Sequence, residues 1–341
     1  MCLSIRSCIV GFFVVLATCA AGVAGPPAGQ WRGLHVLNYG TDATLVELGE
    51  QVPTLARMGI NVLILEINYA FEYQSHPELR MGNTPTTRDG VRKLVATCRA
   101  NGVRLIPQFS CLGHQSWAKN TFPLLTKYPE LDLTPGAFPD NEGIYCREWD
   151  PLNPKVLEIV LPMLDELLDA FDADAMHVGM DEVFLIGSEH SPSTKGKDPA
   201  KVFAKAVNDL HAHLVVKRGV EMLMWGDRLI DSKVFPYGRW EASDNGTAPA
   251  VDLVPKDIII CDWHYGQRDE YPSVPMFIEK GFRVWPAGWN KVEATNALIQ
   301  YSQGFDDPKM LGHLFTTWSG RKKWSEFPPV VEGLKLLEAH D

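Results

Sequence analysis

From residue 33 onward, short apolar runs rich in β-branched residues alternate with longer stretches in which apolar residues recur every three or four positions. This alternation predicts buried parallel strands connected by amphipathic helices, and hence an α/β fold. Eight strands are expected, at residues 33–37, 61–67, 104–109, 175–179, 221–225, 258–263, 282–285 and 311–317. Eight strand-helix units in about 310 residues have the size of a single (β/α)8 TIM barrel.

An open, doubly wound sheet is the alternative arrangement of such units. That fold carries a glycine-rich phosphate-binding turn after its first strand, and no such turn follows residue 37 here. We therefore expect a closed barrel with two extended loops, at residues 110–153 and 183–199. Both loops leave the carboxyl ends of predicted strands, where barrel enzymes build their active sites.

The first 24 residues differ from the rest of the chain. A single charge at Arg6 precedes an apolar run over residues 9–17, and small residues fill positions 20–24. This pattern predicts a secretory signal peptide at residues 1–24, a catalytic domain at residues 25–341, and a secreted or periplasmic protein. The apolar run is too short for a transmembrane segment. Lipidation at Cys19 is an alternative, since Leu16-Ala17-Thr18-Cys19 loosely resembles a lipoprotein cleavage site.

The net charge and the spacing of the cysteines each disfavour a class of ligand. A formal net charge of −10 disfavours nucleic acid as a partner. Neither a metal nor another cofactor is expected, because the cysteines outside the first 24 residues show no metal-ligand spacing. These four are either paired in disulfides or buried as free thiols, and they are Cys98, Cys111, Cys146 and Cys261.

Carboxylates and aromatic residues gather at the predicted carboxyl ends of the strands. They are Glu66, His114, Asp181, Glu182, Trp225, Asp227, Trp263, Tyr265, Trp285, Trp289 and Trp318. Indole rings stack on the apolar face of a pyranose, while fixed acceptors bind its hydroxyls. This composition therefore favours a carbohydrate substrate, with contacts expected from His114, Trp225, Asp227, Trp263, Trp285 and Trp318.

One segment at the end of the fourth predicted strand resembles the signature of glycoside hydrolase family 20, the β-N-acetylhexosaminidases. It reads His177-Val178-Gly179-Met180-Asp181-Glu182-Val183. Other segments agree in order along the chain: Gly113-His114, Leu152-Asn153-Pro154 and Met224-Trp225-Gly226-Asp227. Three more are similar to the hexosaminidase D branch: Leu65-Glu66-Ile67-Asn68, Trp263-His264-Tyr265 and Thr316-Thr317-Trp318-Ser319.

The resemblance implies retaining hydrolysis in which the substrate's own acetamido oxygen is the nucleophile, an exception to the two-carboxylate scheme. Glu182 would then be the general acid and base, Asp181 would orient the acetamido group, and Tyr265 would donate a hydrogen bond to its oxygen. The acid needs a carboxyl group that keeps its proton near neutral pH, which a neighbouring anion and a poorly solvated pocket favour.

Neighbouring residues of a regular strand point to opposite faces. Asp181 and Glu182 can serve one site only if the strand has ended before them, and Gly179 makes that easier. The family's usual arginine after the first strand is missing, since that stretch reads Leu37-Asn38-Tyr39-Gly40. The choice between glucosamine and galactosamine configuration therefore stays open.

Two alternative functions remain open at this level. A degenerate barrel would bind amino sugars without cleaving them. A hydrolase of a different glycan would use an independent carboxylate nucleophile, for which Asp227 is the candidate.

Overall fold

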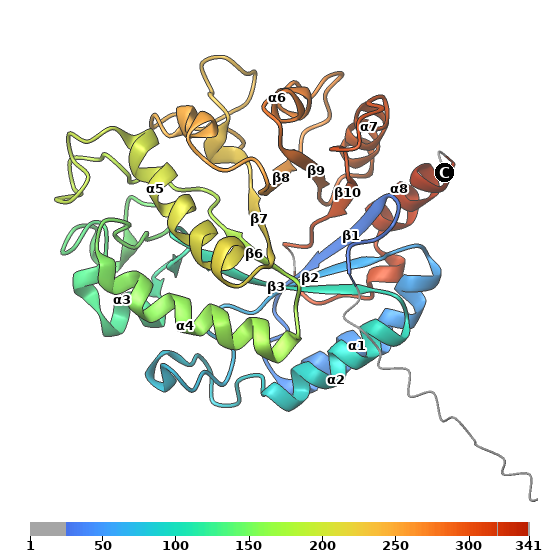
Figure 1. Cartoon of the computed structure of the whole chain (residues 1–341), viewed down its shortest axis with the longest axis horizontal. Coiled ribbons are helices and arrows are strands. Elements are labelled where there is room, and N and C mark those ends of the chain that lie inside the picture. Colours follow the sequence, from blue (N-terminus) through green and yellow to red (C-terminus); the bar gives the residue numbers. More distant parts are fainter. Residues whose placement is uncertain (1–24, 319, 340–341) are drawn as a thin grey trace, which may run out of the picture.

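The computed structural model describes residues 25–318 and 320–339 of the chain (Figure 1). Eight parallel strands form a closed barrel in which the first strand pairs with the last. They are β1 (Trp31–Val36), β2 (Val62–Glu66), β3 (Arg104–Cys111), β6 (Ala175–Gly179), β7 (Glu221–Trp225), β8 (Ile259–Trp263), β9 (Arg283–Gly288) and β10 (Gly312–Phe315). The predicted TIM barrel is confirmed and the open sheet is excluded. The predicted signal peptide and Cys19 lie outside the described residues.

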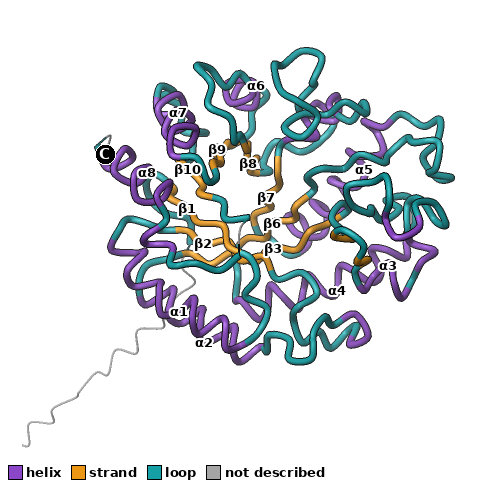
Figure 2. Tube along the Cα trace, turned by 180° about the vertical axis from the view of Figure 1, so that it is seen from behind, coloured by secondary structure: helices purple, strands orange, loops and turns teal. Residues whose placement is uncertain are grey.

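Helices surround the barrel and cover its outer face (Figure 2). They are α1 (Asp42–Arg57), α2 (Arg88–Ala100), α4 (Pro154–Phe171), α5 (Pro199–His211), α6 (Ser273–Glu279), α7 (Val292–Gln303) and α8 (Pro328–Glu338). The unit after β7 differs from the predicted repeat, because a short 3₁₀ helix, Ala248–Asp252, takes the place of an α-helix. Prolines at 236, 249 and 255 interrupt that segment, and proline removes helical hydrogen bonds.

Local sequence fixes where the helices next to the long loops begin. The side chain of Asn153 accepts a hydrogen bond from the Lys155 amide at the start of α4, and Asp198 does the same for Ala200 in α5. A proline follows each of these caps and occupies a position where its missing amide costs nothing. These caps therefore define where the two long loops, which precede α4 and α5, end. Among the described residues, no helix is both long and apolar enough to span a bilayer.

The interior of the barrel is apolar along most of its length. Charged side chains close it at the amino-terminal end. There Arg104 is buried and pairs with Asp174 at 2.8 Å and with Glu221 at 2.6 Å. Its guanidinium lies over the ring of Trp31. Cys98, Cys111, Cys146 and Cys261 are buried free thiols, so the second of the two cysteine alternatives is confirmed.

The loop between β3 and α4 carries a small hairpin, β4 (Ser116–Trp117) and β5 (Asn120–Thr121), and a short helix, α3 (Pro123–Lys127). Glu148 in this loop accepts hydrogen bonds from the amides of Phe184 and Leu185, at 2.6 and 2.8 Å. Phe184 and Leu185 belong to the loop that follows β6. The two long connections predicted from sequence are thus bound to each other at the carboxyl end of the barrel.

The backbone leaves its strand geometry at the end of β6. Gly179 has φ +69°, and Met180 and Glu182 have φ values of +72° and +52°. A Cβ atom on Gly179 would lie 3.0 Å from the Cα of Ser110. β3 also shifts register against β6 between Gln108 and Cys111, and bulges of this kind often lie beside active sites.

We expect Gly179→Ala to destabilise the fold more than a glycine substitution that meets only backbone strain. Gly219 is the matched control, since its φ is also +69° and no atom lies within 4 Å of an added Cβ. Gly219→Ala should cost about 1 kcal/mol for the left-handed conformation. Gly179→Ala should cost at least about 1 kcal/mol more, because the added atom is overpacked. The free energy of unfolding in urea measures both, and equal losses would contradict this account.

Candidate active site

Asp181 and Glu182 face the same imidazole. Nδ1 of His114 lies 3.5 Å from Oδ1 of Asp181, and Nε2 lies 3.1 Å from Oε2 of Glu182. The Asp181 side chain is 11% exposed and that of Glu182 is 14% exposed. The left-handed residues at the end of β6 and just after it therefore turn two consecutive carboxylates toward one imidazole, as a shared site requires.

His114 and Asp181 shift each other's pKa values in opposite directions. Burial alone would lower the pKa of His114, but the Asp181 charge and hydrogen bonds to both carboxylates outweigh it and hold the pKa well above its usual value. Burial would likewise raise the pKa of Asp181, yet the His114 charge and hydrogen bond lower it. An imidazolium between the carboxylates, with Asp181 anionic, is the stable arrangement near neutral pH.

Asp227 supports Glu182 from inside the protein. One of its oxygens accepts hydrogen bonds from the Glu182 amide at 2.9 Å and from Arg228 Nε at 2.6 Å. The other accepts one from Trp263 Nε1 at 3.2 Å. Asp227 is 1% exposed, and burial raises the pKa of its carboxyl group despite the Arg228 charge. The predicted substrate contact from Asp227 is thus replaced by a positioning role, because both of its oxygens already bind protein groups.

An inner aromatic group, defined as Trp225, Trp263, Tyr265, Trp289 and Trp318, lines the mouth of the barrel. The Tyr265 hydroxyl accepts a hydrogen bond of 2.5 Å from Trp318 Nε1, and its ring stacks on Trp263 with centroids 4.9 Å apart. Trp225 is fully buried and lies 5.6 Å from Trp318. Trp289 lies 5.4 Å from Tyr265. Within the group Trp225 and Trp263 are buried, whereas Tyr265, Trp289 and Trp318 are partly exposed.

Trp285 does not belong to this group, so its predicted role in substrate binding is wrong. The ring is fully buried and meets Trp31 edge to face at 5.1 Å. Its Nε1 donates to the carbonyl of Trp31, the first residue of β1. Trp285 therefore fills the barrel near its amino-terminal end, away from Asp181 and Glu182.

Sequence reasoning missed a second set of rings beside Glu182. The outer aromatic group is defined as Trp117, Tyr145, Phe184 and Trp240. Tyr145 packs edge to face against His114 at 5.8 Å, against Trp117 at 5.8 Å and against Trp240 at 4.9 Å. These residues lie in the connections between barrel strands and helices, where no periodic pattern distinguishes them. The sequence pointed to this region only by placing the loops at residues 110–153 and 183–199 after predicted strand ends.

Glu66 is a further, partly buried carboxyl group at the site. It accepts hydrogen bonds from Asn68 at 2.9 Å and from Gln108 at 3.0 Å. Burial raises its pKa to about 7, against the lowering influence of the His114 charge. Glu66 therefore adds a titratable group to the cavity without contacting Glu182 directly.

Among the described residues, His114, Asp181 and Glu182 are the group close enough to hold a metal ion, with ligand atoms within 4.8 Å of one another. Both imidazole nitrogens face carboxylates, which suits a protonated ring better than a metal ligand. We expect EDTA to leave the glycoside hydrolysis predicted from the sequence unchanged when the assay is compared with and without added Zn²⁺ or Mg²⁺. Loss of activity that is restored by metal would overturn the prediction that no metal is needed.

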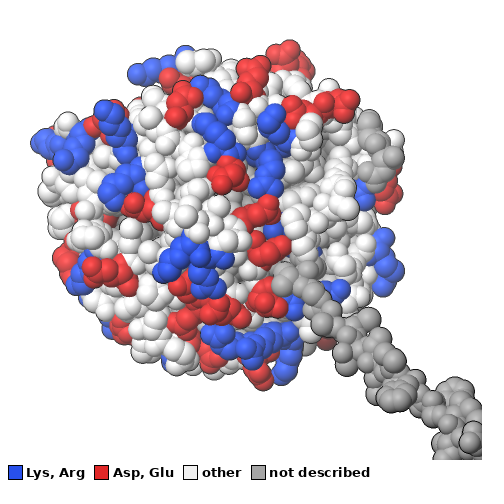
Figure 3. Space-filling view, viewed as in Figure 1, with Lys and Arg blue, Asp and Glu red and all other residues white. Residues whose placement is uncertain are grey.

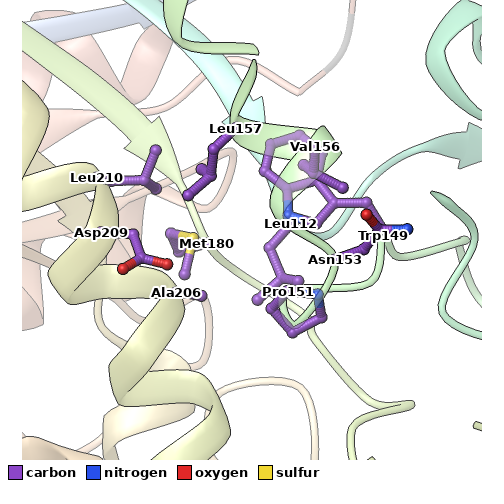
Figure 4. A pocket seen from close by; sticks show the side chains of 10 residues that line it. All are labelled: Leu112, Trp149, Pro151, Asn153, Val156, Leu157, Met180, Ala206, Asp209 and Leu210. Atoms are coloured by element: carbon purple, nitrogen blue, oxygen red, sulfur yellow. The ribbon is translucent and has the colours of Figure 1, made fainter. Parts of the chain in front are cut away.

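Two hollows elsewhere in the protein are weaker candidates for an active site. A void of about 10 Å³ lies between α4 and α5 (Figure 4), lined by apolar residues such as Val156, Met180 and Leu210. That volume holds at most one water molecule. A hollow of about 500 Å³ lies at the opposite end of the barrel, beside Trp31 and Gly312, and no carboxylate lines it.

A buried ion-pair network fixes the end of β8, which carries Trp263, and the start of the loop that carries Tyr265. His264 Nδ1 lies 2.7 Å from Glu241, and Nε2 lies 3.1 Å from Asp262 and 2.8 Å from Ser273. Arg268 also pairs with Glu241 at 2.9 Å. Burial lowers the pKa of His264, but Asp262 and Glu241 outweigh it and raise the pKa to about 9.

This network predicts a pH-dependent stability. The ordinary histidine pKa is about 6.5, so the folded state binds the proton more tightly than the unfolded state between about pH 6.5 and 9. The stabilisation is complete below that range and is lost as pH rises through about 9. The excess in unfolding free energy of wild type over His264→Gln should therefore shrink as the pH rises through this range. A difference that stays constant with pH in urea titrations would contradict the assignment.

On the face seen in Figure 3, acidic and basic side chains alternate, and no broad basic area stands out. A broad basic area is the usual electrostatic footprint of a nucleic-acid-binding surface.

The model of the family described as glycosyl hydrolase family 20, catalytic domain, matches residues 47–285. A β-hexosaminidase of Emericella nidulans is 24% identical over 295 residues, covering 76% of this chain and 43% of the fungal protein. Hexosaminidase D of Bos taurus is 22% identical over 255 residues, covering 73% of this chain and 67% of the bovine protein.

Among solved structures, the chitobiase of Flavobacterium johnsoniae superposes with a TM-score of 0.65 at 17% identity. The superposition covers 91% of this chain and 48% of that protein. The likeness at this identity concerns the fold. The chain spans less than half the length of the fungal and Flavobacterium proteins.

Proposed function

Because the chain belongs to glycosyl hydrolase family 20, we propose that it is a retaining exo-glycosidase that removes terminal β-linked N-acetylhexosamine by substrate-assisted catalysis. One observation carries the proposal: Asp181 and Glu182 both face His114, which lies between them. Relatives named as hexosaminidases support the choice of sugar.

In this mechanism the carbonyl oxygen of the substrate's acetamido group attacks the anomeric carbon, and the bond to the leaving oxygen breaks. Glu182 protonates that oxygen. An oxazolinium ion forms, and Glu182 then takes a proton from the water that opens it, which retains the configuration. Oε2 of Glu182 accepts a hydrogen bond from His114, which orients the carboxyl group for this proton exchange.

Asp181 stabilises the positive charge that develops on the acetamido group. Its lowered pKa keeps it anionic, and an anion in a poorly solvated cavity attracts the acetamido N–H more strongly than it would in water. The Tyr265 hydroxyl already accepts a hydrogen bond from Trp318 Nε1. It is therefore free to donate its own proton to the acetamido oxygen and align it for attack.

The two alternative functions are less well supported. A binding protein without activity has no need of two carboxylates held against an imidazolium. A different glycosidase using Asp227 as nucleophile would need one of its oxygens free, whereas both accept protein hydrogen bonds and the residue is 1% exposed. We also propose that the enzyme acts outside the cytoplasm, on the basis of the signal-like composition of residues 1–24.

Glu182→Gln and Asp181→Asn should each lower kcat/KM on an N-acetylglucosaminyl disaccharide by about 10²- to 10⁴-fold, because each removes a group that acts in the transition state. Glu279→Gln, an exposed residue of α6, is the control for loss of one negative charge. Release of the free sugar measures the rate. Near-normal rates in either site variant would count against the assignment.

A separate substrate comparison tests the nucleophile. Wild type should cleave an aryl N-acetylglucosaminide but not the matching glucoside, and a thiazoline analogue of the cyclic intermediate should inhibit it. Comparable hydrolysis of the glucoside, without thiazoline inhibition, would favour a protein nucleophile instead.

A further inference from the structure

Residues 145–149, here called the bridging segment, join the turn that carries His114 to the turn that carries Glu182. The backbone of the segment donates to the Leu112 carbonyl at 3.0 Å and accepts from the Gln115 amide at 2.9 Å, on either side of His114. A carboxylate of the same segment binds two amides just after Glu182. The position of one turn relative to the other therefore depends on this segment.

Cys146 is the residue of the bridging segment whose side chain bonds to the backbone of both turns. Its Sγ accepts a hydrogen bond from the His114 amide at 3.3 Å. The same sulfur lies 4.0 Å from the Glu182 carbonyl oxygen, to which the thiol donates. The residue is 2% exposed, and burial raises the pKa of the thiol to about 12, so it keeps the proton that it donates. A single side chain thus connects the main chain of His114 to that of Glu182.

Both residues that Cys146 contacts have an unfavourable backbone conformation. His114 has φ +53° and Glu182 has φ +52°, in the left-handed region that residues other than glycine rarely adopt. Such conformations persist only where the surrounding structure fixes them. The thiol bonds to the amide of one residue and to the carbonyl of the other, so it acts directly on the strained backbone. Without it, we expect the distance between the His114 and Glu182 side chains to increase.

We propose that Cys146 is a positioning residue, whose thiol holds His114 and Glu182 at the separation that proton transfer to the leaving oxygen requires. This inference rests on the proposed function, because the separation affects the rate only if Glu182 is the acid. The alternative is that the Cys146 side chain merely fills space, as a buried cysteine often does. The two roles differ in which substrates would be affected by loss of the thiol.

The test compares two aryl N-acetylglucosaminides. Dinitrophenolate leaves without being protonated, whereas methoxyphenolate needs a proton from the acid. The ratio of kcat/KM for the methoxyphenyl over the dinitrophenyl substrate therefore measures the contribution of the acid, and the fraction of folded enzyme cancels in it. We expect Cys146→Ala to lower this ratio about 10-fold, because the acid is misplaced. Cys146→Ser should restore most of it, since a hydroxyl group also accepts and donates.

Cys98→Ala is the matched control, because Cys98 is also a fully buried free thiol but lies in α2, outside the barrel. Its ratio should equal that of wild type. An unchanged ratio in Cys146→Ala, an equal fall in Cys98→Ala, or a fall that Cys146→Ser does not lessen would overturn the proposal. Should Cys146→Ala not fold, Cys146→Val, which fills the space without these hydrogen bonds, takes its place with the same expectation.

A structural measurement separates this inference from the proposed function. If wild type cleaves neither aryl glycoside, the proposed function fails, and the position of the side chains can still be measured. In a crystal structure of Cys146→Ala, or of Cys146→Val, the distance from His114 Nε2 to Glu182 Oε2 should exceed the 3.1 Å of the wild type. An unchanged distance would overturn the positioning role of Cys146.

Discussion

Successive side chains of a β-strand point to opposite faces, and this constraint governs the site. Two neighbouring carboxylates can meet one substrate only where the strand has already ended. β6 ends at Gly179, and the left-handed φ values of Gly179, Met180 and Glu182 turn the chain so that Asp181 and Glu182 both reach His114. The close approach of Ser110 leaves no room for a larger residue at 179. The chemistry of the site thus depends on one backbone conformation.

Two carboxylates so close together would repel each other in a poorly solvated cavity, and the surrounding groups compensate for this. His114 lies between them as an imidazolium, and Asp227 holds the Glu182 amide while being neutralised by Arg228. The long loops are bound to each other through Glu148. The result is a preorganised site, in which charges and dipoles are set before the substrate binds.

The spacing of apolar residues was sufficient to predict the barrel and its eight strands. The acidic pair was predictable too, since it lies in a local motif at a strand end. Long-range contacts were not predictable in the same way. Trp285 was assigned to the site because the seventh predicted strand ended there, but β9 continues to Gly288, so the ring lies deep in the barrel. Asp227 bonds to Glu182 across 45 positions. Tyr145 and Trp240 lie in loops, where sequence carries no periodic signal.

The most direct test is a crystal structure with a thiazoline analogue of the oxazolinium intermediate bound. The ligand should lie over Trp225, with its ring nitrogen on Asp181, Tyr265 at the position of the former acetamido oxygen, and Glu182 beside the anomeric carbon. Asp181 and Glu182 pointing to different cavities, or a ligand bound away from both, would contradict the account.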